Sequence, residues 1–395
     1  MMPLSIQAGR DDLSGSSFPF FHERSVLAMP LSGAIAFLTS VPSLDDRIPP
    51  RSHFPAKLVR GVDDTVRRAR RDEQALTELH RSLFALYELH VADPVLAQAD
   101  NQFSPFLTAL RRRLESRWLD EELRQVKVRP VGDAPGLIAA IRQAVSSHAA
   151  SRHPLFDWLA HTASLSQIQG FFRSDAPLNI RFFDLIVMAM IGSMPEVRTE
   201  LASNFWDEAG RGHSEQSHVH LFRQVLEQTG VGQVSDDFAS HMTWQGLRGY
   251  NLFMLCALNR RHYFKLLGIM AATELLDPPQ YRKLLVGCRR LGWTEATTAY
   301  YDEHVSVDEV HGEGWLQRVI LPLTERTPAA IQDVMTGCML RLSSCNDYYD
   351  DLYRRLKAST GRSWGDQDEA NDENGYRTTG RKRNAEAIAK AGAHP

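Results

Sequence analysis

Helical periodicity is the feature that most constrains the fold of this chain. In segment after segment, apolar residues recur three and four positions apart, which is typical of a helix with one face turned toward a core. No segment shows the apolar and polar alternation of a strand. The sequence therefore predicts an all-α protein. Beyond residue 147, the segments with this period are 154–173, 180–193, 196–209, 214–229, 235–277, 279–291, 294–326 and 328–356.

One predicted helix, 242–276, belongs in the middle of a bundle. Between Leu252 and Leu258 its residues are apolar around most of the helix circumference, which indicates burial on all sides. Pro278 and Pro279 follow, and we expect them to end the helix because proline lacks the backbone N–H of a helical hydrogen bond.

Composition divides the chain into four parts. Residues 1–60 are rich in Pro, Ser and Gly without a sustained period, which predicts a loosely structured arm. Helical patterns at 62–91 and 103–126 indicate a helical extension over 61–134. A helical bundle is expected over 135–356. Apolar residues nearly vanish over 357–395, as is typical of a disordered tail.

Charge and hydropathy exclude several functions. With 45 basic and 48 acidic residues the net charge is −3, which gives no electrostatic basis for nucleic-acid binding. The most apolar stretch, 26–38, is interrupted by Pro30 and Gly33, so neither a membrane span nor a signal peptide is expected. The four cysteines form no CxxC, which argues against a disulfide scaffold or zinc ribbon and favours the reducing cytoplasm.

The strongest local signal for chemistry is the segment YYDEHVSVDEVH, residues 300–311. His304, Asp308 and His311 follow one another at i, i+4 and i+7, so one helix face presents all three. Imidazole and carboxylate together suit iron, manganese or zinc. The alternative is a solvated polar face.

A second signal is a glycine-rich break between two helices. Glu208 ends one helix, Gly210-Arg-Gly follows, and His218 begins the next. The glycines permit a turn that brings Glu208 and His218 together. Glu215 competes for the same role, because Glu215 and His218 have the i, i+3 spacing of ferritin-like di-iron bundles. Spacing alone leaves both partners open.

Two further carboxylates are candidates. Glu274 is the only acid between Leu252 and Leu276, on a helix expected to be buried, where a carboxylate needs a metal or an ion pair; Arg260 and Arg282 are the possible partners. Asp175 precedes a predicted helix, and a helix N-cap or surface role is the simpler interpretation.

Together these residues resemble the ligand pattern of the heme-oxygenase-like di-iron oxidases and oxygenases, a superfamily of iron-containing redox enzymes. The blocks NFWDEAGRGHSEQSHVHLF, LNRRHYFKLLGIMAATEL and YYDEHVSVDEVHGEGWL carry the resemblance, which extends over about 135–356. It implies a heme-oxygenase-like helical bundle that binds two iron ions and dioxygen but no heme. The implied metal ligands are Glu208, His218, Glu274, His304, Asp308 and His311.

The resemblance leaves one ligand position in doubt. Some members carry one more upstream glutamate, and the nearest acid here is the shorter Asp175. Three carboxylates would offset most of the four positive charges of two Fe(II) ions and leave positions open for dioxygen and substrate.

The leading hypothesis is therefore an O2-dependent non-heme di-iron oxidoreductase acting on a small amine or amino-acid-like substrate, by N-oxygenation or oxidative C–C cleavage. The alternative is a non-catalytic ferritin-like metal-binding bundle that uses Glu215. A helical metal-dependent hydrolase is disfavoured, since the chain contains no His-Asp dipeptide. The N-terminal helices could cap the site, form a homodimer or only extend the bundle.

Overall fold

The computed structural model describes residues 21–49, 51–232 and 242–359, and these residues form helices and connecting loops without a strand. The prediction of an all-α protein is confirmed. The chain divides into two compact units, residues 1–121 and 122–395. The division lies earlier in the sequence than the expected boundary at residue 134.

Helices of the first unit begin well before residue 61. They are α1 (Glu23–Leu27), α2 (Leu31–Thr39), α3 (Leu44–Arg47), α4 (Phe54–Arg68), α5 (Glu73–Glu88), η1 (Ala97–Asn101) and α6 (Pro105–Gln125), whose last residues enter the second unit. The expected loosely structured arm is thus wrong for residues 21–49, and residues 1–20 lie outside the described residues. Pro30 precedes the first residue of α2 instead of interrupting a helix, and α2 buries Ile35 and Leu38 in a contact with α5.

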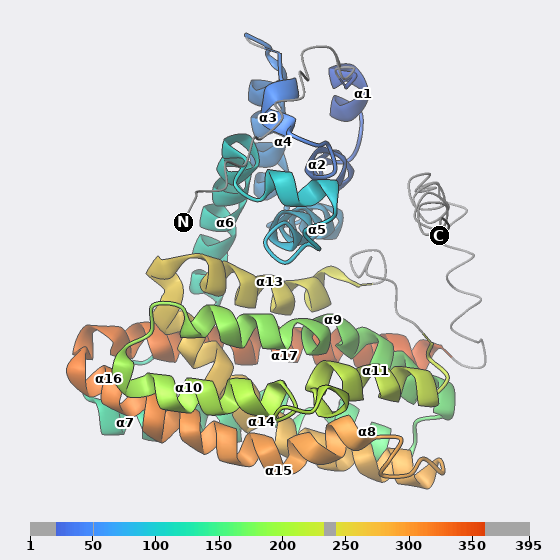
Figure 1. Ribbon diagram of the computed structural model, residues 1–395, viewed down its shortest axis with the longest axis vertical. Helices are drawn as coiled ribbons and strands as arrows, with labels where there is room; N and C mark the ends of the chain where they lie inside the picture. The colour runs from blue at the N-terminus through green and yellow to red at the C-terminus, as the bar shows by residue number, and fades with distance from the viewer. Residues whose placement is uncertain (1–20, 50, 233–241, 360–395) are drawn as a thin grey trace, which may run out of the picture. The chain divides into compact units, whose positions relative to one another are not determined.

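The second unit is a bundle of long helices that run side by side (Figure 1). Its elements are α7 (Ala134–Ser147), η2 (Ala149–Arg152), α8 (Pro154–His161), α9 (Leu165–Met190), α10 (Pro195–Glu208), η3 (Ser214–Gln216), α11 (His218–Gln228), α13 (Trp244–Leu258), η4 (Arg260–His262), α14 (Tyr263–Arg290), α15 (Ala299–Gly314), η5 (Trp315–Ile320), α16 (Leu321–Arg326), η6 (Pro328–Ala330) and α17 (Ile331–Ala358).

Helix α14 is the central helix of this bundle and packs against α8, α15 and α17. Two glycines set its distance from α17. A Cβ on Gly268 would lie 2.0 Å from the carbonyl oxygen of Val334, and a Cβ on Gly337 would lie 2.0 Å from that of Lys265. Both positions therefore require glycine for the two helix backbones to approach this closely.

Prolines do not end the helices where the sequence suggested. Helix α14 continues through Pro278 and Pro279 to Arg290, and α9 continues through Pro177. Each proline costs a helical hydrogen bond, but apolar side chains are buried on both sides of each proline position, among them Leu276 and Leu284 on α14. Burial of the flanking turns favours one continuous helix. The expected single helix 235–277 is instead α13, η4 and α14, and its residues 235–241 lie outside the described part.

The remaining sequence-based expectations concern the tail and the membrane. Residues 360–395 of the expected disordered tail lie outside the described residues, and 357–358 complete α17. Among the helices that the structure describes, none is both long and apolar enough to cross a membrane. All four cysteines are buried and free.

Candidate metal centre

The second unit brings the six predicted ligands together in two buried clusters. The first cluster consists of Glu208, His218 and His304, and the second cluster of Glu274, Asp308 and His311. Within each cluster, one ligand atom from every residue lies within 4.8 Å of the others. Helix α15 contributes to both clusters, because His304 lies one turn before Asp308 and two turns before His311.

In the first cluster, three elements converge on one point. Glu208 is the last residue of α10, His218 is the first residue of α11, and His304 lies on α15. The Nδ1 atom of His218 lies 2.9 Å from Oε2 of Glu208 but without the geometry of a hydrogen bond, and the rings of His218 and His304 have centroids 4.2 Å apart. All three side chains are at most 6% exposed.

The loop between α10 and α11 is what brings Glu208 to His218. Gly210, Arg211 and Gly212 all have positive φ, at 75°, 54° and 91°. A Cβ on Gly210 would lie 2.3 Å from the carbonyl oxygen of His213, so only glycine permits the turn there. The Gly-Arg-Gly break acts as the sequence predicted.

In the second cluster, α14 faces α15. Glu274 is buried on α14, and Nδ1 of His311 lies 3.7 Å from its Oε2 atom. Gly312 lets the helices approach each other at this point, since a Cβ there would lie 3.0 Å from Leu275 Cδ2. Asp308 is buried beside them.

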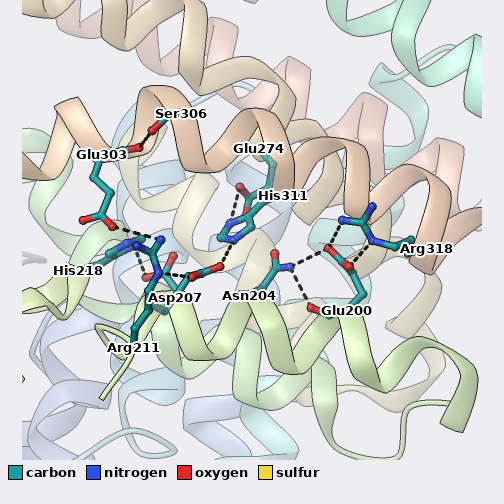
Figure 2. Close-up of polar contacts among 11 residues, drawn as sticks. Glu200, Asn204, Asp207, Arg211, His218, Glu274, Glu303, Ser306, His311 and Arg318 are labelled. Atoms are coloured by element: carbon teal, nitrogen blue, oxygen red, sulfur yellow. Dashed lines mark hydrogen bonds and ion pairs between the residues drawn. The ribbon is translucent and has the colours of Figure 1, made fainter. Parts of the chain in front are cut away.

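Asp207 is a candidate positioning residue that the sequence reasoning missed. Its Oδ2 atom lies 3.0 Å from Nε2 of His311, and its Oδ1 atom accepts a hydrogen bond from Nε of Arg211. Figure 2 shows the side chains of Asp207 and His311 pointing toward one another. A carboxylate that holds the far nitrogen of a ligating histidine orients the ring and increases its basicity.

Hydrogen bonds to acceptors fix which imidazole nitrogen faces each cluster. Nδ1 of His304 lies 2.6 Å from the carbonyl oxygen of Tyr300, and because a carbonyl only accepts, this nitrogen carries the proton and Nε2 is left for a metal ion. For His311 the carboxylate of Asp207 accepts from Nε2, so Nδ1 is left on the side of Glu274.

Burial shifts the protonation of the first cluster. Burial raises the pKa of Glu208 to about 7, against an opposing effect of His304 and His311. The pKa of His218 falls to about 4, chiefly because of burial, and burial together with His218 lowers the pKa of His304 to about 3. At neutral pH both imidazoles are thus neutral, which is the form that binds metals.

The second cluster retains protons when no cation is present. Burial and the neighbouring carboxylates Glu274 and Asp277 raise the pKa of Asp308 well above its usual range. Burial lowers the pKa of His311, but Glu274 and Asp207 outweigh it and raise that pKa to about 9. A metal ion would displace these protons and supply the positive charge in their place.

Unsatisfied polar atoms show that the clusters fit metal ions. Among the described residues, both ring nitrogens of His218, Oε1 of Glu274 and Nδ1 of His311 are buried without a hydrogen-bond partner. Buried polar atoms without partners are costly, and in both clusters they belong to residue types that ligate iron. The donor set therefore fits two metal ions.

We expect Asp207→Asn to weaken metal binding at the second cluster about 10- to 100-fold, because asparagine keeps a hydrogen-bond acceptor but loses the charge that supports His311. Titration of the metal-free protein with Co(II), followed by its absorption bands, measures the effect. Glu309→Gln is the control, since Glu309 is an exposed carboxylate on the helix of His311 and is paired with Arg282. Equal affinities of the two variants would contradict the role of Asp207.

The competing sequence interpretations have clear structural outcomes. The side chain of Glu215 is 63% exposed and lies 3.8 Å from His213, outside both clusters. Neither of the two arginines expected as partners pairs with Glu274. Arg282 pairs with Glu309. Arg260 donates to the carbonyl oxygens of Ile191 and Gly192.

Asp175 is neither an N-cap nor a member of either cluster. It lies inside α9, and its Oδ2 atom accepts hydrogen bonds from Asn179 at 2.9 Å and from the Tyr301 hydroxyl at 3.0 Å. The N-cap expectation is wrong because α9 runs unbroken through this position. Burial raises the pKa of Asp175.

Comparisons with known proteins match the part of the chain that contains this site. Residues 169–344 match the family described as iron-containing redox enzyme, and the six clustered residues all lie within that range. A nitrosourea synthase of Streptomyces achromogenes subsp. streptozoticus is 30% identical over 124 residues, which are 30% of this chain and 25% of that protein. The chain thus matches about a quarter of the length of that curated relative.

Solved structures of a CADD-like protein of unknown function from Nostoc punctiforme are also similar. One, at 2.00 Å resolution, has a TM-score of 0.47 and 16% identity and covers 56% of this chain and 98% of the Nostoc chain. The other, at 1.35 Å, has a TM-score of 0.47 and 14% identity and covers 58% of this chain and 98% of the Nostoc chain.

Proposed function

Residues 169–344 carry the match to the iron-containing redox enzymes, and from that premise we propose that this chain is an O2-dependent non-heme di-iron oxidoreductase. Its substrate is a small amine or amino-acid-like molecule, which it converts by N-oxygenation or oxidative C–C cleavage. The observation that carries the proposal is the pair of buried clusters joined by α15, each with three ligand atoms within 4.8 Å of one another.

The ligand sets of the two clusters favour iron with open coordination positions over an ion that the protein coordinates completely. Each cluster supplies three protein ligands of mixed imidazole and carboxylate type, a set that leaves coordination positions open on non-heme iron. When bound, two Fe(II) ions would supply electrons for the reduction of dioxygen. The two clusters share one helix, so movement of α15 would affect both metal positions together.

The protein's own residues control hydration and ligand orientation at the site. The six clustered side chains are at most 6% exposed, so bulk water has little access to the metal positions. The Tyr300 carbonyl and the Asp207 carboxylate fix the tautomers of His304 and His311. This prior orientation reduces the reorganisation that metal binding requires.

The matched relative supports nitrogen as the reacting atom. Its name, nitrosourea synthase, describes formation of a product with an oxidised nitrogen. Because the match covers 25% of that protein, its reaction and substrate remain a proposal for this chain. Oxidative C–C cleavage is the second outcome that the experiment below distinguishes.

The test is reaction of the anaerobically Fe(II)-loaded protein with ¹⁸O2 in the presence of a panel of amines and amino acids. We expect substrate-dependent O2 uptake, with mass spectrometry locating ¹⁸O on nitrogen for N-oxygenation or in a carbonyl fragment for C–C cleavage. Protein loaded with Zn(II) is the control, since zinc is redox-inactive. Iron binding without any O2 uptake would refute the proposal and support a ferritin-like metal-binding bundle instead.

A further inference from the structure

A cavity of about 50 Å³ lies between α9, α13, α14 and α17. Three ionisable residues line it: Asp175 from α9, Asp277 from α14 and Arg341 from α17. Ionisable groups are rarely buried without partners, so a cavity lined by a guanidinium and two carboxyl groups requires an explanation.

Arg341 is a buried cation without an ion-pair partner in the described structure. It is 7% exposed, and its Nε atom donates to the Thr273 hydroxyl at 2.9 Å. Its two terminal NH2 groups make no further hydrogen bond to a described residue, and the side chain lines the cavity. A planar guanidinium with free N–H groups matches the geometry of a carboxylate.

The two carboxylates share the cavity with Arg341 but do not pair with it. Asp175 is held by Asn179 and Tyr301 through a single oxygen, Oδ2. Asp277 accepts a hydrogen bond from Tyr281. Neither approaches Arg341 within ion-pair distance among the residues described here, although Arg341 acts electrostatically on both. The cavity thus holds a guanidinium and two carboxyl groups that do not pair with it.

The cavity lies next to the candidate metal centre. Asp277 is one helical turn after Glu274 on α14. Tyr281, which also lines the cavity, has its ring centroid 6.2 Å from that of His304. Tyr281 thus both lines the cavity and lies beside His304 of the first cluster, and Asp277 places the cavity lining one turn of α14 from Glu274 of the second cluster.

We propose that this cavity binds the head group of a zwitterionic amino acid, with its carboxylate on Arg341 and its ammonium group on Asp277. The assignment rests on the proposed function, because it makes the bound amino acid the substrate of the adjacent metal centre. A cavity of about 50 Å³ accommodates about three to five water-sized groups, which matches the ammonium, Cα and carboxylate of an amino acid. Aromatic rings of Tyr250 and Tyr348 also line the cavity and favour an ammonium group through cation–π attraction.

The test is a set of binding measurements by titration calorimetry on the full-length metal-free protein. L-alanine, ethylamine and propionate are the probes, since they present both head groups, the amine alone and the carboxylate alone; larger amino acids with their matched amines and acids extend the set. We expect the amino acid to bind at least about tenfold more tightly than either matched compound, because both charged contacts contribute.

Two variants separate the contacts. Arg341→Gln is expected to weaken the amino acid and the acid about tenfold or more and to leave the amine unchanged, whereas Asp277→Asn is expected to weaken the amino acid and the amine and to leave the acid unchanged. Arg289→Gln, at a half-buried arginine paired with Asp302 away from the cavity lining, is the control and should leave all three unchanged.

Equal binding of the three probes, or an equal loss of all three in both variants, would overturn the inference. Its failure is distinguishable from failure of the proposed function, since binding is measured without metal. A protein that binds amino acids but consumes no O2 when loaded with iron would refute only the function. A protein that consumes O2 but shows none of these binding differences would refute only the assignment of the cavity.

Discussion

His304→Ala is expected to lower the iron content from two ions to one per chain and to reduce substrate-dependent O2 uptake to background. The substitution leaves the first cluster with Glu208 and His218 alone, which is too few protein ligands to hold iron in an open non-heme site. The second cluster keeps Glu274, Asp308 and His311, so one ion should remain. Iron analysis after anaerobic loading and gel filtration gives the stoichiometry.

Two matched variants control for indirect effects. His220→Ala removes an exposed histidine from α11, and Glu215→Ala removes the exposed carboxylate that competed with Glu208 in the sequence. Both are expected to keep two irons and full O2 uptake, while circular dichroism confirms that all variants remain helical. Loss of iron in Glu215→Ala, with none in Glu208→Ala, would contradict the assignment of the first cluster.

The metal-free protein is expected to lose stability as the pH rises from 7 to 9. The pKa of His311 is raised from 6.5 to about 9 in the folded state, so the folded chain binds more protons there than the unfolded chain. Stability falls with pH wherever the folded state binds more protons. The pKa values of His218 and His304 are lowered to about 4 and about 3 in the folded state. Their effect on stability therefore changes with pH only below about 6.5 and does not alter the interval from pH 7 to 9.

The size of this loss of stability follows from the rise in the pKa of His311. One pKa unit corresponds to about 1.4 kcal/mol, so His311 alone contributes roughly 3 kcal/mol. This corresponds to a fall in the melting temperature of several degrees. Asp277 is half-buried, and burial raises its pKa to about 8, so its protonation in the folded state likewise makes stability fall as the pH rises to about 8. Thermal unfolding followed by circular dichroism measures the change.

Metal binding should show the opposite dependence on pH. Because a metal ion displaces protons from Glu208 and His311, its affinity should rise from pH 7 to pH 9. The stabilisation by Mn(II) or Zn(II) should therefore grow over the interval in which the metal-free protein weakens. His311→Gln is expected to reduce the pH dependence of the metal-free protein. A melting temperature that is independent of pH in the metal-free wild type would contradict the protonation assigned to His311.

The fold class could be predicted from the sequence because local spacing encodes helices. The six clustered residues needed the resemblance to a known family as well, because spacing left some of their partners open. The i, i+4, i+7 pattern puts His304, Asp308 and His311 on one face of a single helix, whatever that helix packs against. The Gly-Arg-Gly turn indicated that Glu208 could meet His218, but spacing left Glu215 as a second candidate and the resemblance decided between them. Glu274 was identified as the lone acid on an otherwise apolar helix. Their roles as metal ligands remain the prediction that the experiments above test.

Other features depend on contacts between distant segments and could not be predicted. Asp207 lies beside Glu208 in the sequence, and only the position of α15 shows that it holds His311. The prolines of α14 suggested a helix end, because local propensity gives no measure of the burial that keeps the helix intact. Arg341 has no motif around it, and the role proposed for it rests on the cavity that four helices form.

The most direct test of the central claim is the number of iron ions bound per chain after anaerobic loading with Fe(II), measured by elemental analysis together with Mössbauer spectroscopy. Two buried clusters with three ligands each predict two irons per chain, with exchange coupling between them after oxidation by O2. One iron or none per correctly folded chain, or two irons without magnetic coupling, would contradict a di-iron centre.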